Sequence, residues 1–293
     1  MRKTKLYMDT VVDINVVTTK SKVATEAKIN RAFEAFQKVE QACSRFNTES
    51  ELMKASQYVG KPVKISPFLF EPLTFALEIA QLTNGLFDPT VGKIMEENGF
   101  NRQYLTGNFI NSCSAETAHY LDIELDPKNL TMLVKKPLLI DLGAVAKGFA
   151  IDLAANELKE FEGFIVNAGG DLYAGGVNQK GEPWKIGIQH PYLKEKVIET
   201  IEVSDAAVCT SGSYERRNAM QPDVHHIVNP QTKFSPDEWV SSTVIAPFAM
   251  MADGFSTVSF LMAREKAKSF LEDLSLEGLL ITPELELVKV GGI

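Results

Sequence analysis

The middle of this chain is a series of short apolar runs separated by turn residues, and this alternation limits the fold more than any other feature. Short runs bounded by Gly, Pro, Asn and Asp are typical of β-strands. We therefore predict a strand-rich middle, with strands at residues 138–140, 164–167, 184–189, 198–203, 207–210 and 242–245.

On both sides of this region, apolar residues recur at the spacing of a helix. An opening strand follows Met8, and the pairs Ser66-Pro67 and Asn84-Gly85 mark the start and stop of a helix. The remaining expected elements are helices at residues 29–43, 147–158, 250–261 and 264–274, a hairpin at 121–134 and a closing strand pair at 279–290. This order predicts an α+β fold with a mixed, largely antiparallel sheet packed with helices.

The 293 residues suit either one domain with insertions or two closely packed lobes. No internal repeat, low-complexity tract or long linker rich in Pro, Gly or Ser marks a boundary. Both organisations therefore stay open for residues 1–293.

The formal net charge of −8 gives no general attraction to phosphate backbones, so we expect no nucleic-acid partner. An anionic ligand would need locally placed donors or a metal. Cys43, Cys113 and Cys209 are widely spaced and odd in number, and they form no Cys-x-x-Cys pattern. We expect neither a disulfide framework nor a zinc site.

The basic N-terminus resembles the start of a signal peptide, but Asp9 and Asp13 interrupt any apolar stretch. No lipid-attachment cysteine follows, so the sequence as written predicts a cytoplasmic location. Residues 241–263 could imitate a membrane span, yet Pro247 and Asp253 favour a strand followed by a buried helix. We expect no membrane insertion.

Two segments that follow apolar strands are rich in small residues. Residues 140–152 combine a Gly-Ala turn, a helix start and Lys147, and the amide groups of a helix N-terminus suit a phosphate. A close strand-to-helix crossing with a solvated lysine would have the same sequence. In residues 167–171 the double glycine could direct successive amides at an anion, although a plain β-turn is equally consistent.

A third segment contains residues 209–217 and the pair His225-His226. Adjacent histidines on a short strand point to opposite faces, so only one of them can face a given pocket.

The fourth segment places Asp253 and Thr257 four residues apart, on one face of an apolar helix. A carboxylate and a hydroxyl with no basic residue between them suit a hard cation such as Mg²⁺ better than a salt bridge. The alternative is an aspartate that caps a local turn.

In this order and at these separations, the segments resemble the ApbE family of FAD:protein FMN transferases. The residues that carry the resemblance are 87–92 (Phe-Asp-Pro-Thr-Val-Gly), 141–152, 167–171, 210–216, 225–232 and 242–257. The resemblance implies an ApbE-like, T-fold-like architecture. It also implies Mg²⁺-dependent transfer of FMN from FAD to a Thr or Ser hydroxyl of a target flavoprotein, with release of AMP.

The resemblance also implies roles for individual residues. Asp253 and Thr257 would be the catalytic residues and would bind the metal together with the backbone carbonyl of Ala144. Residues implied to bind FAD are Met8, Asp88, Lys147, Asn167, Gly169, Gly170, Thr210 and His226.

Two positions depart from the family pattern, because Asp9 and Lys233 stand where glycine is usual. The carboxylate of Asp9 could reshape a flavin pocket or point outward. Two other functions stay open: an FAD pyrophosphatase that yields FMN and AMP, and a non-catalytic FAD-binding protein. The absence of a signal sequence predicts a target flavoprotein that is soluble or accessible from the cytoplasm.

Overall fold

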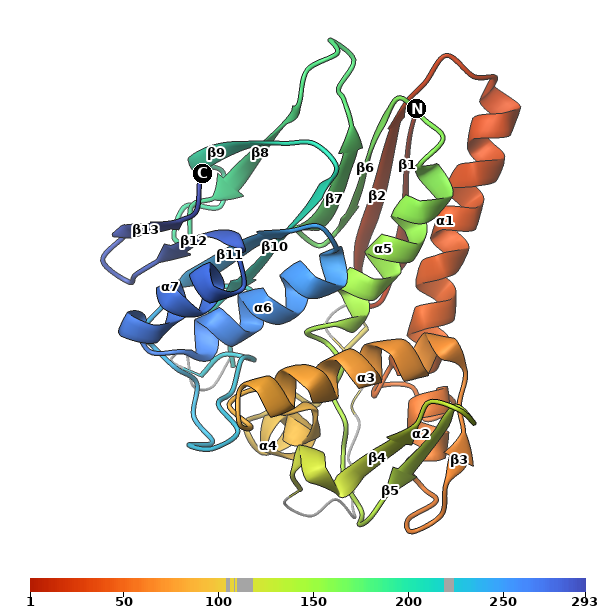
Figure 1. The fold of residues 1–293 in the computed structure, drawn as a ribbon, viewed down its shortest axis with the longest axis vertical. Helices are drawn as coiled ribbons and strands as arrows, with labels where there is room; N and C mark the ends of the chain where they lie inside the picture. Colours follow the sequence, from red (N-terminus) through yellow and green to blue (C-terminus); the bar gives the residue numbers. More distant parts are fainter. Residues whose placement is uncertain (104–105, 108, 110–117, 219–223) are drawn as a thin grey trace. The chain divides into compact units, whose positions relative to one another are not determined.

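The computed structural model describes residues 1–103, 106–107, 109, 118–218 and 224–293 (Figure 1). Cys113 lies outside the described residues. The chain forms two compact units. Unit 1 consists of Met1–Gln37, Lys147–Glu215 and Asp237–Ile293, and unit 2 consists of Lys38–Ala146 and Arg216–Pro236.

The elements follow the predicted α+β order. They are β1 (Arg2–Tyr7), β2 (Thr10–Val17), α1 (Lys22–Cys43), α2 (Glu51–Ala55), β3 (Val63–Lys64), α3 (Pro67–Leu82), η1 (Pro89–Val91), α4 (Gly92–Glu97), η2 (Tyr120–Asp122), β4 (Ile123–Asp126), β5 (Thr131–Val134), α5 (Ala146–Leu158), β6 (Gly163–Ala168), β7 (Asp171–Gly176), β8 (Trp184–Gln189), β9 (Val197–Val203), β10 (Ala206–Gly212), β11 (Ser241–Ala246), α6 (Ala249–Leu261), α7 (Arg264–Asp273), β12 (Glu277–Ile281) and β13 (Leu287–Val290).

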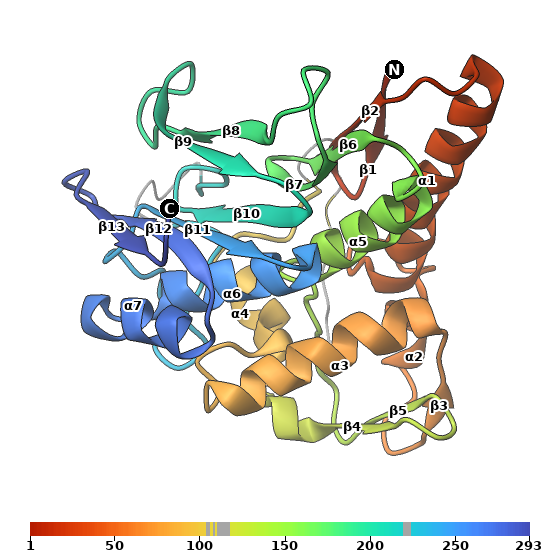
Figure 2. The same cartoon turned by 45° about the horizontal axis from the view of Figure 1, so that its top comes forward.

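Unit 1 is built on an eight-stranded sheet of order β1-β2-β6-β7-β10-β11-β12-β13, in which every neighbouring pair is antiparallel. Helices α6 and α7 cover one face and the β8–β9 hairpin covers the other, as Figure 2 shows. The α+β class and the largely antiparallel sheet are confirmed.

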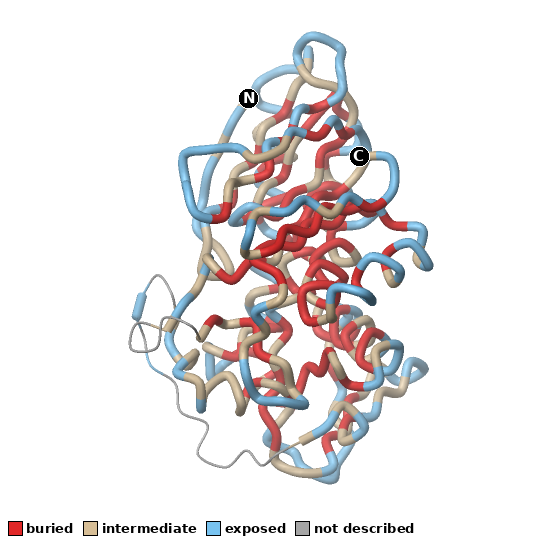
Figure 3. Tube along the Cα trace, turned by 90° about the vertical axis from the view of Figure 1, so that its left-hand side faces the viewer, coloured by how far each residue is buried: buried red, intermediate tan, exposed pale blue. Residues whose placement is uncertain are grey.

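Burial explains why these sequences form strands. All six residues of β11 are buried, because this central strand has a layer on each face, as expected for an apolar run without alternation. In β8, buried Trp184, Ile186 and Ile188 alternate with exposed residues, so this hairpin presents one apolar face to the sheet. Figure 3 shows the buried trace in red.

Unit 2 contains the three-stranded sheet β3-β5-β4 and the longer helix α3. Ser66 is the N-cap residue of α3 and Pro67 its first residue, as predicted. Asn84 and Gly85 follow the helix with φ angles of 50° and 76°, a left-handed conformation that ends helices. The hairpin of β4 and β5 is also confirmed.

One predicted strand does not form, and two strands of the large sheet were not predicted. Residues 138–140 are buried but form an extended segment outside the strands, so that strand prediction is wrong. Strands β1 and β7 were not predicted from the sequence. Within the described residues, no helix has the length and apolarity needed to cross a membrane, and the 241–263 segment forms β11 and α6 as expected.

Candidate functional site

Helix α5 begins at a tight turn that places Lys147 in its first helical turn. The amides of Val145 and Ala146 both donate to the Leu142 carbonyl, at 3.0 and 2.8 Å. The preceding Gly143 amide donates to the Asp141 carboxylate at 2.8 Å, which fixes the turn. The predicted turn of small residues before a helix is confirmed, but the segment that precedes it is extended chain outside the sheets.

Gly148 is the point at which α5 meets α6. A Cβ atom at this residue would lie 2.3 Å from the Ala249 carbonyl oxygen, so only glycine allows this approach. The Gly148 amide belongs to the first turn of α5, where backbone donors have no partner inside the helix. It donates to Asp253 Oδ2 at 3.1 Å.

Asp253 and Thr257 lie on α6 as predicted, one helical turn apart. Asp253 is buried, with 4% of its surface exposed. The Thr257 hydroxyl lies 3.0 Å from the Ser211 hydroxyl of β10 and 3.4 Å from the Asp253 carbonyl oxygen. The helix therefore presents a carboxylate and a hydroxyl on one buried stretch.

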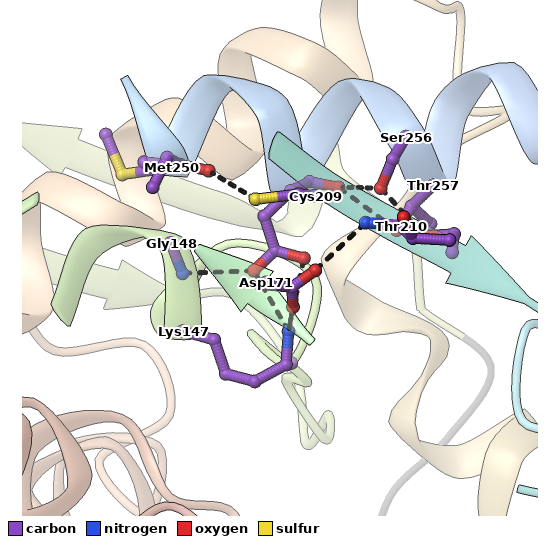
Figure 4. A network of polar contacts seen from close by, with 12 residues as sticks. Lys147, Gly148, Asp171, Cys209, Thr210, Met250, Ser256 and Thr257 are labelled. Atoms are coloured by element: carbon purple, nitrogen blue, oxygen red, sulfur yellow. Dashed lines mark hydrogen bonds and ion pairs between the residues drawn. The ribbon is translucent and has the colours of Figure 1, made fainter. Parts of the chain in front are cut away.

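Lys147 lies between two carboxylates (Figure 4). Its ammonium forms an ion pair with Asp171, the first residue of β7, and lies 3.3 Å from both carboxylate oxygens of Asp253. No basic residue lies between Asp253 and Thr257 in the sequence, but Asp253 forms a salt bridge with Lys147, which comes from another helix. Asp171 was not predicted as a site residue, although an acid directly after a glycine turn was a visible signal.

Burial and neighbouring charges shift the pKa of Lys147 and the pKa of Asp253. Burial by itself would lower the pKa of Lys147, but Asp171 and Asp253 outweigh it, and the pKa lies above its usual value. Burial raises the pKa of Asp253 to about 6, against the opposing effect of Lys147. Lys147 is therefore protonated at neutral pH and holds two acids that would otherwise repel each other.

The double glycine forms the two-residue turn between β6 and β7. Gly169 and Gly170 have φ angles of 66° and 104°, which suit glycine. Both amides donate within the protein: Gly169 to the Val11 carbonyl at 3.1 Å and Gly170 to the Asn167 side chain at 3.2 Å. An anion would have to displace the Asn167 side chain to reach the second amide.

Strand β10 supplies hydroxyl groups beside this ion cluster. The Thr210 amide donates to Asp171 at 3.0 Å, and its hydroxyl lies 2.9 Å from that of Thr243. The Ser211 hydroxyl lies 2.9 Å from that of Ser256 on α6. Strands β7 and β10 and helices α5 and α6 thus bring Lys147, Thr210, Asp253 and Thr257 together with Asp171 and Ser211, which were not predicted.

Three predicted residues belong to unit 2. Asp88 is buried, and its carboxylate accepts hydrogen bonds from the amide and hydroxyl of Thr90 and from the Tyr120 amide at 2.8–3.0 Å. This carboxylate therefore caps η1 and connects it to the start of η2. Ala144 lies in the turn before α5, and its role as a metal ligand stays a prediction.

The two histidines differ in burial. His225 is buried, with Nε2 2.9 Å from the Pro236 carbonyl oxygen, whereas His226 is half-buried. This difference agrees with the expectation that the two side chains point in different directions. The assignment of His226 to FAD binding stays a prediction.

Both departures from the family pattern have left-handed backbone conformations. Met8 and Asp9 form the two-residue turn of the β1–β2 hairpin, with φ angles of 51° and 59°. Lys233 has a φ of 65°. Glycine is favoured at such angles, so the backbone explains why glycine would be usual at positions 9 and 233.

The cluster offers oxygen ligands only. Asp253 and Thr257 present a carboxylate and a hydroxyl, the donors that hard cations prefer. Among the residues that the structure describes, no group of three or more His, Cys, Asp or Glu side chains could hold a metal ion. The carboxylate and hydroxyl oxygens of Asp253 and Thr257 fit the donor chemistry of an oxygen-ligated cation.

Comparisons with known proteins identify relatives of this chain. The ApbE family profile matches residues 8–280. A protein of Salmonella typhimurium named FAD:protein FMN transferase is 33% identical, over 83% of this chain and 73% of its own. One from Klebsiella pneumoniae with the same name is 30% identical, over 90% of this chain and 78% of its own.

Solved structures show the same fold. The ApbE protein of Thermotoga maritima has a TM-score of 0.88 at 28% identity, over 99% of this chain and 97% of its own. The flavin transferase ApbE of Vibrio cholerae has a TM-score of 0.84 at 24% identity, over 99% of this chain and 97% of its own. The family match covers nearly the whole chain, and this protein therefore belongs to the ApbE family.

Proposed function

We propose that this protein is an FAD:protein FMN transferase that modifies a threonine or serine of a target flavoprotein. In this reaction the acceptor hydroxyl oxygen forms a bond to the phosphorus of the FMN half of FAD. The bond from that phosphorus to the oxygen shared with AMP breaks, AMP leaves with the electron pair, and the hydroxyl proton is released. The name shared by the relatives supports this reaction.

The observation that carries the proposal is the ion cluster of unit 1. Lys147, Asp253 and Thr257 come from two of the family motifs and lie together on α5 and α6. A protonated lysine can hold a phosphate, and a buried carboxylate with a nearby hydroxyl can hold a cation. A pyrophosphate substrate needs both.

We infer that the cation is Mg²⁺, bound by the Asp253 carboxylate, the Thr257 hydroxyl and the Ala144 carbonyl. Once bound, Mg²⁺ would neutralise the negative charge that develops on the phosphoryl oxygens. Because Lys147 already contacts Asp253, it would have to share this carboxylate or move further toward Asp171. The family resemblance also assigns FAD contacts to Met8, Asp88, Asn167, Gly169, Gly170, Thr210 and His226.

Mass spectrometry tests the proposal directly. Purified protein with FAD, MgCl₂ and a flavoprotein domain that carries an acceptor threonine should release AMP and leave FMN covalently on that threonine. Replacing the acceptor threonine by alanine should abolish the adduct, and serine should keep part of it, because it offers the same nucleophilic oxygen. Binding measured by flavin fluorescence should favour FAD over ATP and NAD.

Matched variants test the site. Asp253→Asn should reduce transfer by about 10- to 100-fold or more, because a weaker ligand replaces the carboxylate. The control is Asp205→Asn, at a carboxylate of unit 1 that accepts the Gly176 amide at 2.9 Å, and it should transfer like the wild type. Rapid release of free FMN and AMP with any acceptor would instead indicate a pyrophosphatase. Tight FAD binding without turnover would indicate a binding protein.

A further inference from the structure

Helix α6 begins without a cap of its own. Its N-cap residue is Phe248, whose side chain cannot accept a hydrogen bond, and the first amides of a helix have no partner inside it. These amides need acceptors from elsewhere.

Asp152 of α5 supplies both acceptors. Its Oδ1 accepts the Ala249 amide at 2.6 Å, and its Oδ2 accepts the Met250 amide at 2.9 Å. A carboxylate at a helix N-terminus also interacts favourably with the helix dipole. The half-buried Asp152 thus caps a helix that lies far away in the sequence.

The same two helices are linked a second time, in the opposite sense. Gly148, one turn before Asp152 on α5, donates its amide to Asp253, which lies one turn after Ala249 on α6. Each helix therefore contributes one aspartate that binds an N-terminal amide of the other. Between these two hydrogen-bonded contacts, Gly148 has no side chain and lets the backbone of α5 approach the backbone of α6.

We propose that Asp152 is a positioning residue that fixes α6 against α5 so that Asp253 stays beside Lys147 and Gly148. This inference rests on the proposed function for its catalytic consequence, but its structural part stands without it. Asp152 contacts the backbone of α6 and neither Asp253 nor Thr257, so it acts through the placement of the helix.

The first test separates positioning from simple capping. Asp152→Ala should lower the melting temperature and reduce transfer by about tenfold or more. Phe248→Ser adds an ordinary N-cap to α6 in place of an exposed phenylalanine and should transfer like the wild type. The double variant Asp152→Ala/Phe248→Ser has a capped α6 without the link to α5. It should regain most of the melting temperature while transfer stays low.

A second readout needs no substrate. The Gly148 amide is bound to Asp253, so its hydrogen-exchange rate, measured by NMR, reports whether Asp253 stays in place. We expect faster exchange at Gly148 in Asp152→Ala and in the double variant, and the wild-type rate in Asp205→Asn. Asp152→Asn keeps one acceptor and should be intermediate.

Recovery of both transfer and Gly148 protection in the double variant would show that Asp152 only caps α6 and would overturn the proposal. Wild-type exchange at Gly148 in Asp152→Asn and Asp152→Ala would overturn it as well, even where the double variant remains unstable. A wild-type protein that shows no transfer would overturn the proposed function alone, because the exchange experiment is read without FAD.

Discussion

Lys147 keeps its positive charge in a place where burial opposes it. Its side chain is 24% exposed, and its partners Asp171 and Asp253 are 7% and 5% exposed. Two nearby carboxylates in a poorly solvated region favour the ammonium form and raise the pKa of the lysine. The positive charge of the lysine in turn lies between the two carboxylates and contacts both of them.

Removing Lys147 should therefore cost far more stability than removing a surface lysine. Lys147→Ala leaves two buried carboxylates uncompensated, and we expect a loss of about 3 kcal/mol in the free energy of unfolding. The matched control is Lys185→Ala, which breaks an exposed pair with Glu202 and should cost less than about 1 kcal/mol. Urea denaturation at pH 7 measures both. Equal losses would show that the buried cluster is not held by the lysine.

Asp9 and Lys233 have left-handed backbone conformations, which lower the stability of the folded protein relative to glycine at these positions. Asp9→Gly and Lys233→Gly should each stabilise the protein by about 0.5–1 kcal/mol, because the side chain crowds the backbone at positive φ. The gain should be larger for Lys233, since aspartate tolerates this conformation better. Denaturant midpoints measure the gain, and a loss of stability in both variants would contradict it.

Buried His225 should make stability depend on pH. Burial lowers its pKa, while the hydrogen bond with the Pro236 carbonyl works in the opposite direction. The unfolded chain then binds more protons than the folded chain below the ordinary histidine pKa of about 6.5, so stability falls as the pH drops through this range. We expect a smaller loss between pH 7 and pH 5 in His225→Gln than in the wild type. Identical pH dependence would rule out this contribution.

At the scale of elements, α3 contains a proline in its interior that is offset by a neighbouring helix. Pro72 has no amide hydrogen to donate to the Phe68 carbonyl. The Cys43 thiol at the end of α1 lies 3.3 Å from that carbonyl oxygen and donates to it. Burial raises the pKa of Cys43, so the thiol keeps its proton.

This pairing predicts an interaction energy between two sites. Cys43→Ala should cost about 1 kcal/mol more in the wild-type protein than in Pro72→Ala, where the new amide satisfies the carbonyl. Cys43→Ser retains a donor and should show little of this difference. Additive losses in the double-mutant cycle would mean that the thiol contributes by packing alone.

Elements with strong apolar patterns were predictable, and those held by pairing were not. Strand β8 has an alternating apolar pattern and β11 is a continuous buried run, so each is recognisable from its own sequence. Half of the residues of strand β1 are charged and most are exposed, and this segment is a strand because it pairs with β2. Strand β7 has two glycines and a polar start. Residues 138–140 are apolar and buried, yet their burial does not come from sheet pairing.

The candidate site was predictable to the same degree. The spacing of Asp253 and Thr257 follows from helix geometry alone and was confirmed. The contact of Lys147 with Asp253 joins residues that are 106 positions apart and depends on the close approach at Gly148, which no local pattern reveals. Asp152 gives no cap signal in its own helix, because it caps another.

At the scale of the whole molecule, two of the four passages of the chain between the units lie inside helices. One passage, from Gln37 to Lys38, lies inside helix α1, and another, from Ala146 to Lys147, lies in the first turn of α5. Helical residues carry none of the composition that marks a domain boundary. The sequence could therefore not decide between one domain and two lobes.

The order of strands in the large sheet has a consequence during synthesis. Strand β2 pairs with β6, so Val17 can pair only after Gly163 has been synthesised. The residues synthesised between them contribute most of unit 2. At about 5–20 residues per second, the apolar side chains of β2 stay without this partner for about 7–30 s. Nascent chains halted before Gly163 should therefore bind a chaperone that recognises apolar strands, and chains released past Ala168 should not.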